Sequence, residues 1–539
     1  MGETRLQQRK ETPPPPRPPP STKDGSSQPL GTSLLMRFIT DHRGLIMVMV
    51  VVPLSFVWEW TMFFRDLIYR KFLVSPELHD ARVKEVQAQV KRWHESSLRG
   101  VKPMCTARRE WLSMSTRTAT FKEDCSKIEL GKLRDILFVD TEKNIVRAEP
   151  LVNMRYMTDH LLPLGRQLAV QVEMEELTVG GLCLGLGMET TSHVSGLIQE
   201  TVIAYEVVLS DGALVRATKT SHSDLFFALP WSHGSLGFLV AVELRIIPTK
   251  PCIRLTYTPC HTKEQLESTM RSLALSPQPP TFLEATVYSK ETSVIMHGTF
   301  AEYPTGQERR KVNRLNYFWK QWFFLHCQQA LEKGEFQEYV PARHYYHRYT
   351  RGVFWEMRDL IPFGNSPWYR YLLAWMGAPK ISLIKLTMSP QIRQDVVYKH
   401  VVQDIIIPLT ELSRSIDLFD SLFEIYPLLV FPIAIFKHQG KKTFIISQPE
   451  GIDALPGKDK AASMFFDLGA YGVPQKVREN RPWSAYQAIR AMEAYTRDVN
   501  GYQCLYSDTF MTRSEFRDMF DHTLLDQMRQ ALSHCLQTD

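Results

Sequence analysis

A glycine-rich stretch from Thr178 to Gly196, TVGGLCLGLGMETTSHVSG, constrains the fold more than any other segment of the chain. It lies between two strand-like runs, Gln167 to Val172 and Thr201 to Leu209. Because glycine has no side chain, such a backbone can approach a ligand closely and present its N–H groups to an anion. Short glycine motifs also occur as tight structural turns. The stretch therefore predicts either an anion-binding loop, suited to a pyrophosphate, or a turn.

The residues after this stretch favour the ligand-binding interpretation. SDLFFAL at Ser223–Leu229 and GSLG at Gly234–Gly237 precede an apolar strand, Phe238 to Ile247. The pattern is neither the Rossmann GxGxxG nor a P-loop. Its order resembles the flavin domain of the vanillyl-alcohol oxidase/PCMH superfamily, in which a glycine-rich loop holds FAD. The resemblance implies FAD contacts from Thr178, Val179, Gly180, Gly181, Leu182, Cys183, Leu184, Gly185, Leu186, Gly187, Met188, Glu189 and Thr190.

The first phosphate loop of that superfamily, of the type RGxGHS, has a divergent counterpart here. Met104 to Arg109 reads MCTARR, which lacks the glycines and the histidine. In related flavoproteins that histidine often carries a covalent bond to the flavin. The resemblance therefore implies FAD that is bound non-covalently.

An apolar segment, Gly44 to Phe64, carries one charged residue, Glu59. About 20 apolar residues span a bilayer as a helix, and Trp58 and Trp60 suit the membrane interface. We predict a single transmembrane anchor over 44–64. A buried soluble helix and a re-entrant or monotopic helix stay open, because Pro53 lies mid-segment. Basic residues flank both ends, so orientation is assigned only by preference, with the larger part in the cytosol.

The composition narrows the remaining function classes. A chain of 539 residues predicts two or more domains. The net charge of +6 is mild and no nucleic-acid motif is present, so no nucleic-acid partner is expected. The eight cysteines have no metal-ligand spacing, which favours reduced thiols and no metal site. The proline-rich residues 1–33 are predicted to be a disordered tail.

Local patterns predict a mixed helix and strand chain. Ser75 and Pro76 are typical of a helix start, and an apolar stripe follows at Val83, Val86, Val90 and Trp93. Further predicted strands are 136–139, 145–148, 404–409, 423–436, with a break at its two prolines, and 465–468. Further predicted helices are 154–164, closed by Gly165, then 484–500 and 513–536. Dense aromatic residues over 317–376 indicate either a membrane-interface surface or an aromatic core.

Six longer strings identify the chain as a member of the delta-24 sterol reductase (Diminuto-like) family. They are HYYHRYTRGVFWEM, DLIPFGN, APKISLIKLT, VVQDIIIPL, FFDLGAYGVP and GYQCLYSDTFMTRSEFRDMFD. With the apolar segment and the glycine loop in matching order, the resemblance covers about residues 45–521. It implies an α+β fold with a two-subdomain PCMH-type FAD-binding domain at 73–249. An α+β substrate or cap and C-terminal domain is expected at 250–539.

The resemblance also implies an activity and a location. The expected enzyme uses FAD and NADPH to saturate the carbon 24–25 double bond of a sterol, as in desmosterol to cholesterol. It is expected in the endoplasmic reticulum membrane as a single-pass protein, with the Golgi as an alternative. The expected partners are the sterol and the lipid bilayer. A homo-oligomer and complexes with other sterol-pathway enzymes stay open.

The residue that donates the proton is not fixed by the sequence. Tyr471 is placed first and Tyr506 second, because both lie in the C-terminal part that returns towards the flavin in this superfamily. His347 and Glu424 are alternatives, and each of the four is also interpretable as a hydrogen-bonded structural residue. His193 is expected to contact the cofactor or cap a backbone group. Two rival functions stay open, a flavin oxidase of the same fold and a non-catalytic sterol-binding protein.

Overall fold

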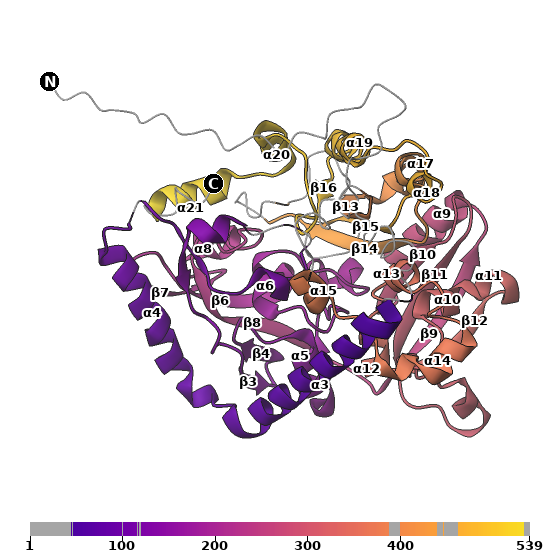
Figure 1. Cartoon of the computed structure of the whole chain (residues 1–539), viewed down its shortest axis with the longest axis horizontal. Helices are drawn as coiled ribbons and strands as arrows, with labels where there is room; N and C mark the ends of the chain where they lie inside the picture. The colour runs from indigo at the N-terminus through magenta and orange to yellow at the C-terminus, as the bar shows by residue number, and fades with distance from the viewer. Residues whose placement is uncertain are drawn as a thin grey trace.

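Two large β-sheets organise the computed structural model, which describes residues 45, 47–99, 101–115, 117, 120–387, 399–438, 446 and 462–532 (Figure 1). The predicted tail, residues 1–33, lies outside these residues, as does Cys535. The arrangement is the predicted α+β class: helices and mostly antiparallel strands in two units, with one long apolar helix near the N-terminus.

The first sheet is built on one long buried strand, β8 (Phe238–Pro248), whose near-continuous apolar sequence explains its central place. Strand order is β3-β4-β8-β6-β7, and β5 also pairs with β8. A separate parallel pair joins β1 to β2. The bounds are β1 Met104–Thr106, β2 Ser126–Ile128, β3 Ile136–Asp140, β4 Ile145–Ala148, β5 Arg166–Leu168, β6 Val202–Val208 and β7 Leu214–Thr218.

Helix α4 (His79–Glu95) covers the edge of this unit, and its predicted stripe is confirmed. Val83, Val86, Val90 and Trp93 are all buried. The predicted start is confirmed in position: Ser75 is the N-cap residue and Pro76 the first residue of a 3₁₀ turn, Pro76–Leu78, that precedes α4, although the Ser75 side chain makes no capping hydrogen bond. The Ser75 backbone N–H instead donates to Oδ2 of Asp135, 3.1 Å away.

The second sheet has eight antiparallel strands in the order β12-β9-β11-β10-β14-β15-β13-β16. One face is covered by helices α9 (Lys263–Ala274), α17 (Leu412–Phe423) and α19 (Ala485–Asp498). The opposite face carries an aromatic cluster and contacts the first unit. The strands are β9 Cys252–Cys260, β10 Phe282–Val287, β11 Ser293–Ala301, β12 Phe336–Pro341, β13 Val401–Pro408, β14 Leu428–Phe436, β15 Ala462–Gly472 and β16 Tyr502–Gln503.

Short helices connect and cover these sheets. They are α5 Met154–Leu161, α6 Val179–Leu184, α7 Ser192–Ser195, α8 Ser223–Ala228, α10 Phe323–Gln328, α11 Ala330–Lys333, α12 Ala342–Tyr346, α13 Glu356–Leu360, α14 Pro367–Leu372, α15 Ile381–Thr387, α18 Gln475–Arg478, α20 Arg513–Met519 and α21 Thr523–Ala531. Gly165 ends the predicted 154–164 helix with φ 64°, as expected of a left-handed C-cap.

Two predicted elements are wrong in their bounds. The predicted strand 423–436 begins only at Leu428, because Phe423 ends α17 and Glu424 adopts φ 49°. Pro432 does not break β14. The pairing of β14 with β10 ends at Val430, so Pro432 has a strand partner on one side only and its missing N–H costs no ladder bond there. The predicted helix 513–536 is two helices, α20 and α21.

The long N-terminal helix runs from Met47 to Leu73, with α3 (Val52–Ile68) between the turns η1 (Met47–Val51) and η2 (Tyr69–Leu73). Among the described residues it is the one helix long and apolar enough to cross a membrane. It lies along the outside of the folded body beside α5 and α14 (Figure 1).

The aromatic-rich region divides between the two predicted roles. Tyr345, Tyr349 and Trp355 are fully buried in the aromatic cluster of the second sheet. Trp368 and Trp375 are half exposed on the outer surface. The two interpretations therefore apply to different parts of the region.

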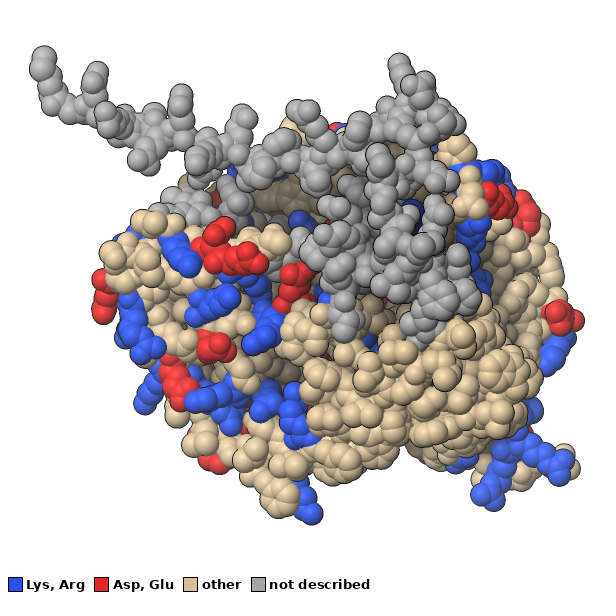
Figure 2. Space-filling view, viewed as in Figure 1, with Lys and Arg blue, Asp and Glu red and all other residues tan. Residues whose placement is uncertain are grey.

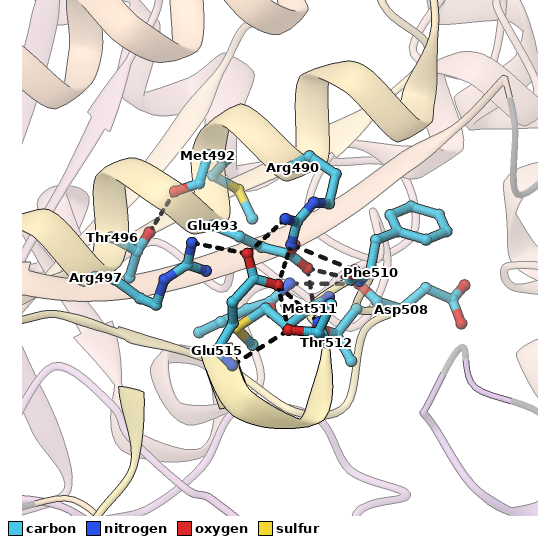
Figure 3. Close-up of polar contacts among 12 residues, drawn as sticks. Arg490, Met492, Glu493, Thr496, Arg497, Asp508, Phe510, Met511, Thr512 and Glu515 are labelled. Atoms are coloured by element: carbon cyan, nitrogen blue, oxygen red, sulfur yellow. Dashed lines mark hydrogen bonds and ion pairs between the residues drawn. The ribbon is translucent and has the colours of Figure 1, made fainter. Parts of the chain in front are cut away.

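The C-terminal helices are fastened by an ionic cluster between α19 and α20 (Figure 3). Nη2 of Arg490 lies 2.6 Å from Oε1 of Glu515, and Oε1 of Glu493 accepts from the Phe510 backbone N–H at 2.7 Å. Thr512 and Glu515 form a capping box at the start of α20. This cluster fixes residues 502–525, which return to the core of the first sheet. Residues from both sides of position 250 thus share the core of the first sheet, and the predicted domain boundary between 249 and 250 stays a prediction.

Candidate functional site

Helix α6 holds the first two glycines of the organising stretch in contrasting environments. A Cβ on Gly180 would lie 2.6 Å from Cβ of Pro150, so only glycine allows this close approach. Gly181 is exposed, and a Cβ there would meet only Oγ1 of Thr178, at 3.3 Å. One glycine thus packs the helix against the domain, and the next leaves its outer side open.

The loop after α6 has backbone donors without acceptors. Within the described residues, the N–H groups of Leu186, Gly187 and Met188 donate to no protein atom, although Gly187 is buried. Nε2 of Gln199 meanwhile donates to the carbonyl oxygen of Gly185, 2.5 Å away. Buried amides are almost always paired. These three adjacent N–H groups could donate to the acceptor atoms of a bound anion.

A buried ionic cluster anchors the end of the loop to the second unit. Nη2 of Arg348 lies 2.8 Å from Oε1 of Glu189, and Nε lies 2.8 Å from Oε1 of Glu284. Burial alone would raise the pKa of Glu189, but the Arg348 charge lowers it. Burial and the adjacent Glu189 hold the pKa of Glu173 well above its ordinary value. The ion pairs of Arg348 with Glu189 and Glu284 therefore fix the end of the loop against the second unit.

The loop lies between the two sheets. Met188 packs against the core of the first unit and against the aromatic cluster of the second. The carbonyl oxygen of Thr190 accepts from the Leu283 N–H of β10 at 2.9 Å. Ile406 and Phe465 of the second sheet belong to the same core as the first sheet. One face of β13 and β15 is thus directed at the loop's unit.

A phenol and two carboxyl groups lie on that face. Tyr471 donates its hydroxyl proton to Oδ1 of Asp404 across 2.6 Å. Asp467 lies on β15 opposite Ile406, two positions along the ladder from the Asp404–Gly469 pair. Both Asp467 oxygens and Oδ2 of Asp404 are buried without a partner among the described residues. Unpartnered buried carboxyls are rare in proteins and are typical of functional sites.

Burial controls the protonation of this cluster. It raises the pKa of Asp404 to about 7, against which the Tyr471 hydrogen bond acts weakly. Burial and the neighbouring Asp404 hold the pKa of Asp467 well above its ordinary value. Burial and the same carboxylates also raise the pKa of Tyr471. The cluster can therefore store protons at neutral pH.

The other sequence-predicted residues are placed as follows. Tyr506 is half buried, and its carbonyl oxygen accepts from Oγ of Ser115 at 2.7 Å. His347 uses both ring nitrogens, towards Glu173 O at 2.8 Å and Thr158 Oγ1 at 2.9 Å. Glu424 pairs with Arg481 on the surface. Nε2 of His193 contacts the Pro280 carbonyl oxygen at 2.8 Å. The structure thus brings Tyr471, but neither His347 nor Glu424, into the carboxyl cluster.

The divergent first loop is supported from outside itself. Nζ of Lys385, in α15, donates to the carbonyl oxygens of Ser113 and Ser115 at 2.9 and 2.8 Å. Nζ of Lys122 donates to the carbonyl oxygen of Arg108 at 2.9 Å. Lys122 therefore holds one carbonyl group of the loop in which the usual glycines are missing, and Lys385 holds the segment that follows it.

Sequence reasoning missed Asp404, Asp467 and Arg348 as site residues. A signal was present, since each lies within a string that carried the family resemblance. Asp404 and Asp467 are single charges inside strongly apolar strands, which is unusual unless the charge has a role. Their proximity depends on the register of β13 and β15, which the sequence does not give.

Comparison with known proteins shows the family to which the chain belongs. A family model for an FAD binding domain matches residues 82–218. The Delta(24)-sterol reductase of Homo sapiens is 39% identical over 92% of this chain and 92% of its own length. A Delta(24)-sterol reductase homolog of Caenorhabditis elegans is 38% identical over 92% of this chain and 93% of its own. The Arabidopsis thaliana Delta(24)-sterol reductase is 35% identical over 92% and 89%.

The fold, the glycine loop and the matched domain define an FAD-binding oxidoreductase. The identity over nearly the whole chain adds the substrate class. The chain belongs to the Delta(24)-sterol reductase family.

Proposed function

We propose that this protein saturates the Δ24 double bond of a sterol side chain, as in desmosterol, with FAD as cofactor and NADPH as the source of reducing equivalents. The observation that carries the mechanism is the buried Tyr471–Asp404 hydrogen bond on the sheet face directed at the glycine loop's unit. An isolated alkene is not polarised. Its reduction therefore needs a hydride held against one carbon and an acid close to the other.

Residues 178–190 are the proposed FAD contacts. The open side of Gly181 and the free amides of Leu186, Gly187 and Met188 fit a ligand rich in acceptor oxygens. The segment 104–109 contains no histidine, which supports non-covalent binding. When bound, reduced FAD supplies the hydride and NADPH restores the reduced state.

Tyr471 is the proposed proton donor. When Asp404 is protonated, it can donate to the phenol oxygen, which leaves the phenol proton free for the alkene carbon. Asp404 then transfers its proton to the phenolate and is reprotonated from water. Asp467 is a second carboxyl group nearby that can hold a proton. Hydride and proton together add two hydrogens to the sterol, and NADPH is oxidised. Tyr506 is the second proposed donor, because Cys504, two residues earlier, donates its N–H to the Asp404 carbonyl oxygen at 2.9 Å.

Aromatic rings pack against Tyr471. The ring centroids of Phe354 and Trp355 lie 5.0 and 5.6 Å from that of Tyr471. Nε1 of Trp355 also donates to the Tyr471 carbonyl oxygen at 2.9 Å. Apolar rings next to the carboxyl cluster suit a hydrocarbon side chain and would exclude water from the alkene.

A membrane location accords with such a substrate. We place the protein at the endoplasmic reticulum membrane with its catalytic part in the cytosol, where the seven free cysteines of the described residues would stay reduced. Self-association and complexes with other sterol enzymes are not needed for the proposed chemistry.

The test is the complete reaction under anaerobic conditions. The purified holoprotein should show an oxidised flavin spectrum, bleach with NADPH, and recover on addition of desmosterol, with a product two hydrogens heavier. Recovery by oxygen with peroxide release, but not by desmosterol, would favour a flavin oxidase. A protein that stays colourless after added FAD would favour the sterol-binding alternative.

A further inference from the structure

The outer face of the N-terminal helix is mostly apolar, and its exposed charges, Arg65 and Lys71, lie in the C-terminal part of the helix. Eleven of its large apolar side chains, and Leu45 just before it, are exposed, from 45% for Trp60 to 70% for Phe72. The opposite side, with Val48, Val52 and Ser55, is buried against the body. The exposed residues are Leu45, Met49, Val50, Leu54, Val57, Trp60, Phe63, Phe64, Leu67, Ile68, Phe72 and Leu73. An exposed apolar face of this size marks an interaction surface in a folded protein.

Polar contacts fasten the helix to the folded body at several levels. Oε1 of Glu59 lies 3.0 Å from Nζ of Lys380 and 3.5 Å from Nη2 of Arg155. Further along, the Tyr69 hydroxyl donates to Oδ1 of Asp135 at 2.8 Å. A helix that crossed a bilayer would have to leave these partners. Glu59 would then stand unpaired in hydrocarbon, which is strongly unfavourable.

A second exposed segment lies beside the helix, although it is distant in sequence. Trp368, Tyr371, Leu372 and Trp375 of α14 and the turn η9 (Ala374–Met376) are each 50–66% exposed. The rings of Trp375 and Phe56 pack edge to face with centroids 5.3 Å apart. Figure 2 shows a broad expanse without charged side chains in the region where Figure 1 places α14 and the N-terminal half of α3.

The composition of this joint surface fits a lipid bilayer rather than a protein partner. Tryptophan and tyrosine are the residues preferred at the boundary between headgroups and acyl chains. Lys71, at the end of the helix, is exposed beside Phe72 and can reach lipid phosphates. Basic side chains also gather at the border of the uncharged area (Figure 2).

We propose that the protein is monotopic: α3, α14 and η9 together lie in one leaflet, and the N-terminal helix does not cross the membrane. Both ends of the chain are then on the same side of the bilayer. The proposal takes the membrane association from the proposed function, but it does not depend on the sterol chemistry. It also makes the exposed aromatic segment of α14 and η9 part of the membrane anchor.

The direct test is the topology of the full chain in sealed endoplasmic reticulum vesicles with their cytosolic face outward. Epitope tags are placed before Met1 and after Asp539, and protease is added outside. The proposal predicts that both tags are digested. Protection of the N-terminal tag with digestion of the C-terminal tag would establish a spanning helix and overturn the proposal.

A pair of variants tests the second segment. Leu372→Glu/Trp375→Glu should lower flotation with vesicles of phosphatidylcholine and phosphatidylserine by on the order of tenfold. The matched control, Leu214→Glu/Val101→Glu, changes two exposed apolar residues on the first unit and should float normally. Retained flavin absorbance shows that each variant is folded. Equal flotation of both folded variants would overturn the role of α14 and η9. Flavin turnover is measured separately, so loss of reductase activity is distinguishable from loss of membrane contact.

Discussion

The hydroxyl oxygen of Tyr471 lies 2.6 Å from Oδ1 of Asp404, and the two side chains come from neighbouring antiparallel strands, β15 and β13. Both are buried on the face directed at the glycine loop's unit. Gly469 pairs with Asp404 in the ladder and has no side chain to separate them. The hydrogen bond between Tyr471 and Asp404 therefore depends on the register of β13 and β15 and on the absence of a side chain at Gly469.

Gly469→Ala should disturb this pair directly. A Cβ at position 469 would lie 2.6 Å from the Tyr471 hydroxyl oxygen and still closer to Oδ1 of Asp404. We expect slower sterol reduction and a loss of about 1–3 kcal/mol in the free energy of unfolding, as for other overpacked cores. Denaturant unfolding and turnover check this. Gly131→Ala, in an open turn, is the control, and unchanged turnover in Gly469→Ala would contradict the assigned geometry.

Asp404→Asn should change the pH profile of sterol reduction. Burial raises the pKa of Asp404 to about 7, so in the wild type its proton is lost as the pH rises through about 7. The step that consumes desmosterol should then slow about tenfold per pH unit above that value. Asparagine keeps an N–H donor that does not ionise but cannot pass a proton to the phenol, so the variant should react more slowly at neutral pH and should lose this alkaline limb. A limb that persists unchanged in the variant would assign the titration to another group.

Asp467→Asn should stabilise the protein most at alkaline pH. Burial and the nearby Asp404 hold the folded pKa of Asp467 above its unfolded value. The stability gained from the bound proton is complete below the unfolded pKa of about 4, and it is lost as the pH rises through the folded pKa. The variant's gain in Tm over the wild type, on the order of a few °C, should be larger at pH 8 than at pH 5. A gain that is equal at both values would show that Asp467 is ionised in the native state.

Gly181→Trp should remove the cofactor without unfolding the domain. Gly181 is exposed and open, whereas a Cβ at Gly187 would lie 2.8 Å from Cγ2 of Ile198 and disturb the core. We expect FAD affinity to fall at least about tenfold, which corresponds to about 1.4 kcal/mol. Flavin absorbance after gel filtration measures it. Gly131→Trp is the matched control. Full flavin occupancy in Gly181→Trp would move the cofactor away from α6.

Periodicity and glycine spacing predicted much of the first unit. The stripe of α4, the strands 136–139 and 145–148, and the Gly165 cap are local features, and each agrees with the structure. The start of β14 was missed because α17 runs to Phe423, and the predicted break at Pro432 was wrong because proline is a strand breaker only by its local pattern. Only the sheet order reveals that one side of it has no partner strand.

The candidate site was predictable only in part. Tyr471 was named as a candidate from its place in a motif, but Asp404 and Asp467 were not. The role of a carboxyl group inside a strand depends on the residue next to it on the neighbouring strand. Here Asp404 and Tyr471 are more than 60 positions apart in the chain. The aromatic region was undecided for a similar reason, since Trp355 and Trp375 differ in burial although their sequence surroundings are alike.

The most direct measurement of the central claim separates the two halves of the reaction in Tyr471→Phe by anaerobic stopped flow. Flavin reduction by NADPH should proceed at the wild-type rate, because no proton passes to an alkene in that step. Reoxidation by desmosterol should slow by about 10²–10⁴-fold, the usual contribution of a general acid. Tyr495→Phe removes another buried hydroxyl on the opposite face of the second sheet and should leave both halves unchanged. Wild-type reoxidation in Tyr471→Phe would contradict the assignment of Tyr471 as proton donor.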